Sequence, residues 1–420
     1  MLIFTKTIGW RLLTGSVLAS LIGMALTTAG CGGGGGGGGA EPTAASQTSS
    51  QLAAKERQQH RLSPVAALGE LAFNDPSLSA SGQQSCASCH AADTAHAAPN
   101  ALAVQLGGPA LNIQGLRASQ SLRYLASNTA FQFDKDGAPS GGFFWDGRAN
   151  SLAEQAAGPL LGAREMANSD KAAVVAKIAR AAWANDFRAL YGANVFNDVD
   201  RAFNKLTDAL ARYQREDAEF NAYTSKYDAV LRGKATLDAQ EQSGLQVFND
   251  PAKGNCAACH TSAKSPDGKH PLFTDFSYDN LGVPRNPEIT ANADAAYFDL
   301  GLCGRAELKG RDDLCGLFRV PSLRNVAVRK TFFHNGRFKS LKEALTFYVQ
   351  RDTDPAKWYS KNKDGSVNKF DDLPARYQAN VNTSEAPYDR RQGDTPALNE
   401  SEIDQLLAFL KTLNDGWSAK

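Results

Sequence analysis

Two copies of the pattern C-x-x-C-H constrain this chain more than any other feature of its sequence. The first copy occupies residues 86–90 and the second residues 256–260, 170 positions further on. The spacing lets two thiols attack the two vinyl groups of a haem while the adjacent histidine reaches its iron. A zinc knuckle would need a second ligand pair nearby, and a thioredoxin-type dithiol would need a βαβ context that the sequence does not show. The motifs predict two covalently bound c-type haems, held by Cys86, Cys89, His90, Cys256, Cys259 and His260.

The N-terminal 30 residues have the pattern of a secretory signal. Lys6 and Arg11 precede an apolar run over 12–29, which is too short and too rich in small residues at its end for a membrane span. The run leads directly to Cys31, which predicts a lipoprotein signal peptide over 1–30 and a lipid anchor on Cys31; the alternative is cleavage at an Ala-rich site. Residues 31–60 include eight consecutive glycines and predict a flexible tether. The expected location is the periplasm, with membrane contact only through the anchor.

The net charge bears on possible binding partners, and the two remaining cysteines bear on a disulfide. Lys and Arg number 45 against 44 Asp and Glu, a net charge of +1 that supplies no field directed at phosphates, so no nucleic-acid partner is expected. Cys303 and Cys315 have no adjacent histidine and are expected to form a disulfide in the oxidising periplasm. With 42% apolar residues, the 420-residue chain can bury real cores, and its length fits two or three domains.

Helical periodicity predicts a mainly α fold with two cytochrome c-like haem domains side by side. Apolar residues recur at helical spacing between 170 and 227, and an amphipathic segment precedes each C-x-x-C-H motif. The pattern N-E-S-E at 399–402 resembles a capping box that opens a C-terminal helix. The first haem domain is expected over 61–227 and the second over 228–420. The polar stretch 352–398 is expected to lie outside the core.

Few side chains can bind the second face of each iron. His90 and His260 supply the proximal ligands. The other histidines of the mature chain are His60, His96, His270 and His334. Met166 is the only methionine outside the signal, so paired His/Met ligation at both haems is impossible. At least one iron is therefore five-coordinate, and open to reaction, or takes a less common ligand.

Five short motifs lie in a fixed order around these histidines. They are F-W-D-G-R at 144–148, S-L-A-E-Q-A-A-G-P at 151–159, E-M at 165–166, V-P-S-L-R-N-V at 320–326 and F-H-N-G at 333–336. Together they resemble the bacterial di-haem cytochrome c peroxidases and their MauG-like relatives, over roughly residues 68–413. The resemblance implies that the N-terminal haem reacts with hydrogen peroxide and that the C-terminal haem passes electrons to it.

The resemblance assigns roles to three residues of the first domain. Trp145, Gln155 and Glu165 reproduce the family's spacings. Cleaving an O–O bond needs a group that takes a proton from one oxygen and returns one to the other, which a carboxylate such as Glu165 can do. Gln155, an amide that does not titrate, would orient peroxide or its water, and Trp145 would relay an electron between the haems. Without the family spacing, the same residues would be a surface carboxylate, part of a solvated helix face and a core anchor.

Two departures from the peroxidase pattern concern the haem faces. No histidine occurs between His96 and Trp145, where many of these peroxidases carry one that blocks the reactive haem. The N-terminal haem is therefore expected to be open, high-spin and active without prior reduction. Tyr348 stands where the peroxidases place an axial Met and MauG-like enzymes place Tyr. We expect Tyr348 to bind the second iron as a phenolate, which stabilises oxidised iron and lowers its potential; the alternative is a Tyr on the inner face of a helix over 341–349.

The resemblance also implies supporting groups. Arg148 and Arg324 are expected to pair with haem propionates, because a guanidinium is the natural bidentate partner of a carboxylate. A calcium ion between the haems is implied, with the backbone carbonyls of Arg329 and Thr331 as ligands.

Three functions follow from these residues. The expected one is a periplasmic peroxidase that reduces hydrogen peroxide to water with electrons from a small cytochrome or cupredoxin. The second is a MauG-like oxidation of aromatic residues in a partner protein, which Tyr348 favours. The third is an electron carrier without catalysis, against which Gln155 and Glu165 argue. Formation of a homodimer is left open.

Overall fold

Helices carry most of the regular structure of residues 62–419, the part of the chain that the computed structural model describes. The predicted signal peptide, Cys31 and the tether lie outside the described residues. The helices are α2 (Pro64–Asn74), α3 (Cys86–Cys89), α4 (Leu152–Leu161), α5 (Lys171–Ile178), α6 (Ala184–Tyr191), α7 (Val199–Glu216), α8 (Lys226–Leu231), α9 (Ala239–Asn249), α10 (Leu341–Gln350) and α11 (Glu400–Lys411). The prediction of a mainly α fold is confirmed.

Three small antiparallel sheets of two strands each complete the regular structure of this part of the chain. They pair β1 (Leu106–Gly107) with β2 (Ile113–Gln114), β3 (Gln132–Phe133) with β4 (Pro139–Ser140), and β5 (Tyr278–Asp279) with β6 (Phe318–Arg319). The first two are local hairpins. The third joins segments almost forty residues apart in the sequence and brings β6 beside the second C-x-x-C-H motif.

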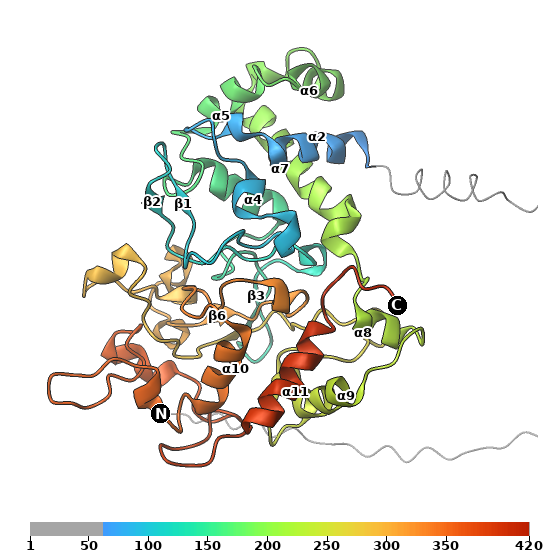
Figure 1. Ribbon diagram of the computed structural model, residues 1–420. Coiled ribbons are helices and arrows are strands. Elements are labelled where there is room, and N and C mark those ends of the chain that lie inside the picture. The colour runs from blue at the N-terminus through green and yellow to red at the C-terminus, as the bar shows by residue number, and fades with distance from the viewer. Residues whose placement is uncertain (1–61, 420) are drawn as a thin grey trace, which may run out of the picture. The chain divides into compact units, whose positions relative to one another are not determined.

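Two hydrophobic cores organise the described residues. The first collects side chains from α2, α4, α5 and α7, and the second collects side chains from α9, α10 and α11. Figure 1 shows these two groups of helices in different parts of the fold. Each core contains the helix that precedes one C-x-x-C-H motif, so each motif is built on a core of its own. A domain boundary between 227 and 228 stays a prediction.

Both cores contain the same close contact between a glycine of one helix and the backbone of another. A Cβ added to Gly69 in α2 would lie 2.0 Å from the Ala209 carbonyl oxygen of α7. A Cβ added to Gly244 in α9 would lie at the same 2.0 Å from the Gln405 carbonyl oxygen of α11. Only glycine permits backbones to approach this closely. In both halves the helix before the haem motif therefore lies directly on a longer helix that follows it in the chain.

Local signals set the helix ends. Ser63 caps α2 by accepting from the Ala66 amide, and Pro64 occupies the first helical position. The predicted capping box before α11 is confirmed, because Asn399 accepts from the Glu402 amide while the Glu402 carboxylate accepts from the Asn399 amide. A capping box of the same kind, formed by Asp238 and Glu241, opens α9.

The stretch 352–398 differs from its expectation. It contains only 3-10 turns, yet Trp358, Tyr359 and Leu398 belong to the second core. The expectation that this stretch lies outside the core is therefore wrong. Aromatic residues spaced among Asp, Lys and Asn anchor the loop in the core, and Asp352 and Asp372 are buried with them. The predicted disulfide between Cys303 and Cys315 is confirmed.

Candidate functional site

The second C-x-x-C-H motif opens onto a large cavity, which we call the second cavity after this motif. Cys256, Cys259 and His260 line it, together with apolar side chains from β6, α10 and the segments around them. Nδ1 of His260 donates to the carbonyl oxygen of Phe273 at 2.8 Å, which leaves Nε2 as the nitrogen free to bind a metal. Burial lowers the pKa of His260, so the imidazole is neutral, as an iron ligand must be.

The first C-x-x-C-H motif has the same construction. Nδ1 of His90 donates to the carbonyl oxygen of His96 at 3.0 Å, and burial lowers the pKa of His90 to about 4. Both acceptor residues have a left-handed backbone, with φ of 52° at His96 and 54° at Phe273. Non-glycine residues rarely adopt this conformation, and retained strain of this kind concentrates at functional sites. His90 and His260, the two predicted iron ligands, are therefore oriented in the same way.

The four thiols of the motifs are not joined in disulfides. Burial raises the pKa of Cys86 to about 12 and that of Cys89 to about 11, and it raises the pKa of Cys256 to about 12. A raised pKa keeps a thiol protonated and slow to form a disulfide, because the thiolate is the reactive form.

Two arginines in the cavity lack an anionic partner. Arg319 and Arg329 both line it, and neither forms an ion pair with any residue between 62 and 419. Burial lowers the pKa of Arg329 to about 10 and also lowers the pKa of Arg319. Buried guanidinium groups are costly unless an anion neutralises them. Thiols, a free imidazole nitrogen, apolar walls and unpaired cations together fit a haem, which would bring two propionates.

Arg324, which the sequence pointed to as a propionate partner, lies elsewhere. Its side chain is 1% exposed, and its two terminal nitrogens each donate to a carboxylate oxygen of Asp228 at 2.9 Å. Its third nitrogen donates to the carbonyl oxygen of Pro271. Arg324 is not among the residues that line the cavity, whereas Arg319 and Arg329 are. Sequence analysis missed these two arginines, because motif letters do not tell which side of a loop faces a cavity.

Arg148 is half-exposed in the loop that carries Trp145. It pairs with Asp146 at 2.9 Å and stacks on the Phe144 ring at 3.6 Å. Asp146 also accepts from Arg117 at 2.6 Å, and Arg117 reaches on to Asp299 at 2.6 Å. The loop that carries Trp145 is thereby fixed by charges from both halves of the chain. The propionate role of Arg148 stays a prediction.

Glu165 lies beside the first pair of thiols. It follows α4 in a turn, where its amide donates to Gly162 and its carbonyl accepts from Gly108, both at 2.8 Å. The residue is exposed, yet the protein atoms around its carboxyl desolvate it and raise its pKa, which the charge of Arg148 partly offsets. Its negative charge in turn raises the pKa of Cys86 and Cys89, which places it in their electrostatic range.

Gly162 provides the space for this carboxyl. A Cβ at position 162 would lie 2.5 Å from Oε2 of Glu165, closer than atoms can approach. Gln155 is half-buried in α4, whose start is capped by Ser151. The predicted acid/base residue and its predicted amide partner therefore come from one helix and the turn that follows it.

Trp145 belongs to the first half of the chain but lines the second cavity. Its indole Nε1 donates to the Ala118 carbonyl at 2.9 Å, and its own carbonyl accepts from the Arg319 amide at 2.8 Å. The Ala118 amide donates to the carbonyl of His334 at 2.7 Å. Three hydrogen bonds therefore connect Trp145 with the walls of the second cavity.

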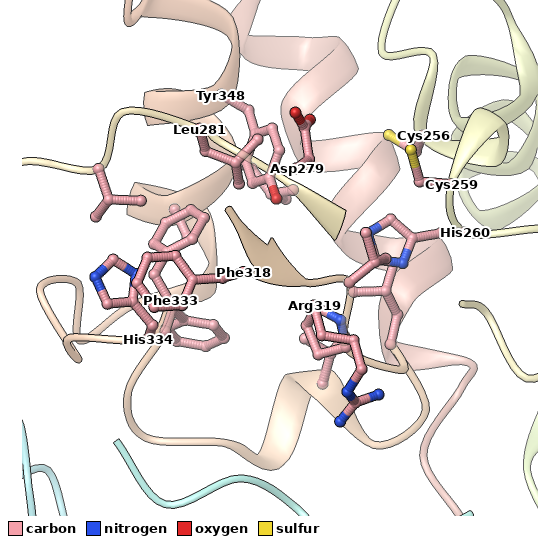
Figure 2. A pocket seen from close by; sticks show the side chains of 18 of the residues that line it. Cys256, Cys259, His260, Asp279, Leu281, Phe318, Arg319, Phe333, His334 and Tyr348 are labelled. Atoms are coloured by element: carbon pink, nitrogen blue, oxygen red, sulfur yellow. The ribbon is translucent and has the colours of Figure 1, made fainter. Parts of the chain in front are cut away.

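Tyr348 projects from α10 into the same cavity. Figure 2 shows Tyr348, Asp279 and His260 around one space, with the side chains of Cys256 and Cys259 beside them. Burial raises the pKa of the Tyr348 phenol, and the charges of Asp279 and Cys256 add to the effect. A buried phenol loses its proton readily only when a strong electrophile such as a metal ion binds its oxygen. The axial role of Tyr348 stays a prediction.

The remaining histidines of the described residues have other partners, and His60 lies outside these residues. His96 is buried against the Phe220 ring at 4.1 Å and contacts Glu219 at 3.3 Å, and His270 contacts Asp228 at 2.5 Å. His334 lines the cavity and stacks on Phe318 with ring centroids 3.6 Å apart. Residues 62–419 contain no group of three or more His, Cys, Asp or Glu placed to hold a metal ion, and calcium ligation by the carbonyls of Arg329 and Thr331 stays a prediction.

A mainly helical fold with two haem-binding motifs, each on its own core, defines a di-haem c-type redox protein. The chain belongs to the di-haem cytochrome c peroxidase and MauG-like family. The family profile described as di-haem cytochrome c peroxidase matches residues 63–236. Membership implies two c-type haems and places the protein among the oxidoreductases.

Individual relatives include members of both branches. Methylamine utilization protein MauG of Paracoccus denitrificans is 36% identical over 361 residues, which cover 84% of this chain and 88% of that protein. Cytochrome c551 peroxidase of Nitrosomonas europaea is 28% identical over 288 residues, which cover 67% of this chain and 71% of that protein. The crystal structure of the diheme peroxidase BthA from Burkholderia thailandensis superimposes with a TM-score of 0.78 at 40% identity, covering 85% of this chain and 87% of that one.

None of the helices between residues 62 and 419 combines the length and the hydropathy needed to cross a membrane.

Proposed function

We propose that this protein reduces hydrogen peroxide to water at the first C-x-x-C-H site, with electrons that arrive through the second. The observation that carries the proposal is the Glu165 carboxyl, whose pKa the nearby protein raises and whose charge acts on the thiols of Cys86 and Cys89. A bound haem supplies an iron that can bind a small oxygen ligand and exchange electrons. The protein supplies the proton transfers, the orientation of the substrate and the route for electrons.

Glu165 is the acid/base in this proposal. Its raised pKa keeps the carboxyl closer to neutrality than a surface glutamate, so it can both accept a proton at Oε2 and return it. Gln155 offers an amide N–H and a carbonyl oxygen on the preceding helix and orients the peroxide without titrating. Gly162 leaves the space that the carboxyl occupies, because a Cβ at this position would lie 2.5 Å from Oε2 of Glu165.

Trp145 and Tyr348 control the electrons. Trp145 lines the second cavity and is bonded to Ala118 and Arg319, which supports its role as relay between the two sites. Tyr348 faces the side of the cavity that carries Cys256, and as an axial ligand it would lower the potential of the second centre. Arg319 and Arg329 would hold the propionates of that haem.

A second candidate function is oxidation of aromatic residues in a partner protein. Tyr348 favours it, because an anionic oxygen ligand suits a centre that stores oxidising equivalents better than one that receives electrons from a high-potential cytochrome. The 36% identity with a MauG protein points the same way. We propose a periplasmic location with a lipid anchor at Cys31 for either function, and a small cytochrome or cupredoxin as donor for the first.

Electron paramagnetic resonance of the ferric protein tests the site assignment. We expect one high-spin signal from the open first haem and one low-spin signal from the second. Tyr348→Met should change only the low-spin signal, while Tyr388→Phe, a change to another tyrosine of the same cavity, should leave both signals intact. Low-spin signals alone would remove the open site, and a low-spin signal indifferent to Tyr348→Met would remove the phenolate.

Turnover then separates the two functions. Peroxide consumption with a reduced cytochrome as donor, lost in Glu165→Gln, supports the peroxidase. A mass increase or cross-link in a partner protein, formed with peroxide in the absence of a donor, supports protein oxidation.

A further inference from the structure

Two tyrosines connect the second cavity with the protein surface. Tyr124 is 2% exposed and lines the cavity together with His260 and Trp145. Tyr223 is partly exposed, and its ring lies 4.9 Å from the Tyr124 ring, centroid to centroid, at 70°. The backbone amide of Tyr223 donates to the Tyr124 hydroxyl at 3.0 Å. An oxidisable side chain inside the cavity is therefore in contact with one that reaches water.

The backbone of both tyrosines is strained. Tyr124 has a φ of 66° and Tyr223 a φ of 48°, in the left-handed region that bulky residues rarely adopt. The Tyr124 amide donates to the Phe220 carbonyl at 2.7 Å, which helps to hold this conformation. Retained strain of this kind is found where side-chain placement has a function.

The surroundings of the pair suit a one-electron oxidation. The Tyr124 hydroxyl donates to the Asp415 carboxylate, with both oxygens at 2.7 Å. The Arg324 guanidinium lies over both rings, 4.7 Å from the Tyr124 centroid and 4.5 Å from the Tyr223 centroid. A fixed positive charge disfavours a protonated radical cation, so an electron can leave Tyr124 only if the phenolic proton leaves too. Asp415 is placed to take that proton.

We propose that Tyr124 and Tyr223 carry oxidising equivalents, one at a time, from the second cavity to a one-electron donor at the surface. The inference rests on the proposed peroxide chemistry, which supplies the oxidant: hydrogen peroxide with two protons takes up two electrons and gives two molecules of water. Each electron follows the same route through the pair. The donor is a one-electron reductant that cannot enter the cavity.

Each step balances. Tyr124 gives one electron to the centre in the cavity and its phenolic proton to Asp415. Tyr223 then gives one electron to Tyr124, which regains its proton from Asp415. The Tyr223 side chain is partly exposed, and its phenolic proton leaves to water. The surface donor returns one electron to Tyr223, and water returns the proton.

A purely structural role for the pair makes different predictions. Asp415 also accepts from Asn325 at 2.6 Å and from Arg123 at 3.2 Å, so the cluster fastens the C-terminal segment as well. Loss of activity in a variant would therefore not separate the two roles. The decisive readout is a radical located on tyrosine.

The test uses the holoprotein with both haems, grown with ring-deuterated tyrosine or with ordinary tyrosine. Each sample is mixed with hydrogen peroxide and frozen within milliseconds to seconds for electron paramagnetic resonance. We expect an organic radical whose hyperfine splitting narrows on deuteration, which requires no variant. Tyr124→Phe should lose this radical. Tyr223→Phe should keep it, but ferrocyanide, the surface probe donor, should quench it more slowly than in the wild type.

Tyr227→Phe is the matched control. Tyr227 is buried, donates to the Ser262 carbonyl at 3.2 Å and does not line the cavity, so its loss should leave the radical unchanged. A radical unaffected by deuteration, or one that survives Tyr124→Phe, overturns the inference. Peroxide consumption is followed in the same samples. Consumption without a tyrosine radical removes the inference and leaves the peroxidase proposal standing, whereas no consumption by the wild type removes both.

Discussion

Residue 162 has no side chain, and this leaves the space into which one oxygen of Glu165 projects. In Gly162→Ala the added Cβ would lie 2.5 Å from Oε2, whereas ordinary contact begins at 3.4 Å. The carboxyl must therefore move by about 0.9 Å, or rotate away from residue 162. The next neighbour of the added Cβ is the Gly158 carbonyl at 3.3 Å, so only the carboxyl has to move far.

The change should separate activity from stability. Gly162 has a φ of −61° and a ψ of 118°, which alanine adopts without strain. Such a substitution restricts the unfolded chain and stabilises the fold by about 0.4–1 kcal/mol. A misplacement of about 1 Å in a reacting group can cost about 10²-fold in rate. We therefore expect peroxide turnover to fall by up to about 10²-fold while the melting temperature is unchanged or slightly higher.

The assay is steady-state peroxide reduction with a reduced cytochrome, with kcat and KM resolved and the melting temperature measured alongside. Gly304→Ala is the control, because its added Cβ would meet nothing closer than 4.0 Å. Wild-type kcat in Gly162→Ala, together with a large loss in Glu165→Gln, would refute the reasoning. Such a result would mean that a displacement of the Glu165 carboxyl by about 0.9 Å does not affect the reaction.

Three further outcomes are expected. Because burial raises the pKa of Glu165, the acidic limb of kcat/KM should lie above about pH 4.3 and disappear in Glu165→Gln, with a rate loss of about 10²–10⁴-fold. Arg324→Leu leaves the buried Asp228 carboxylate unpaired and should destabilise the fold by about 3–5 kcal/mol in thermal unfolding. Burial opposes charge on Asp228, but Arg324 outweighs it and lowers the pKa, so the stabilisation should be complete at neutral pH and be lost as pH falls below about 3.9. Trp145→Phe removes the donor to the Ala118 carbonyl and should slow electron transfer between the haems in stopped-flow measurements without weakening peroxide binding.

The parts of the fold that could be predicted from the sequence depend on neighbouring residues. The capping box at Asn399 and Glu402 is written within four residues, and so is each C-x-x-C-H motif. The disulfide between Cys303 and Cys315 followed because the other exported cysteines were already assigned to the motifs. Each of these signals is complete within a short stretch of chain.

The parts that could not be predicted depend on tertiary contacts. Arg319 and Arg329 face the cavity only because β6 pairs with β5 and the following loop folds back, while Arg324 from the same loop meets Asp228, 96 positions earlier. Trp358 and Tyr359 looked like part of a polar excursion, because average composition hides the few aromatic residues that reach a core. The need for glycine at position 162 depends on where the Glu165 side chain lies, which the sequence does not tell.

The way both proximal histidines are held has a consequence for the division of labour between the two centres. His90 and His260 each donate to a neutral peptide carbonyl, at 3.0 Å and 2.8 Å, and not to a carboxylate. Each ring therefore donates to an acceptor of the same kind, and each would pass electron density alike to an iron bound at its other nitrogen. Under the proposed function, a difference between the two centres would have to come from the opposite faces, where Glu165 and Tyr348 are the predicted residues.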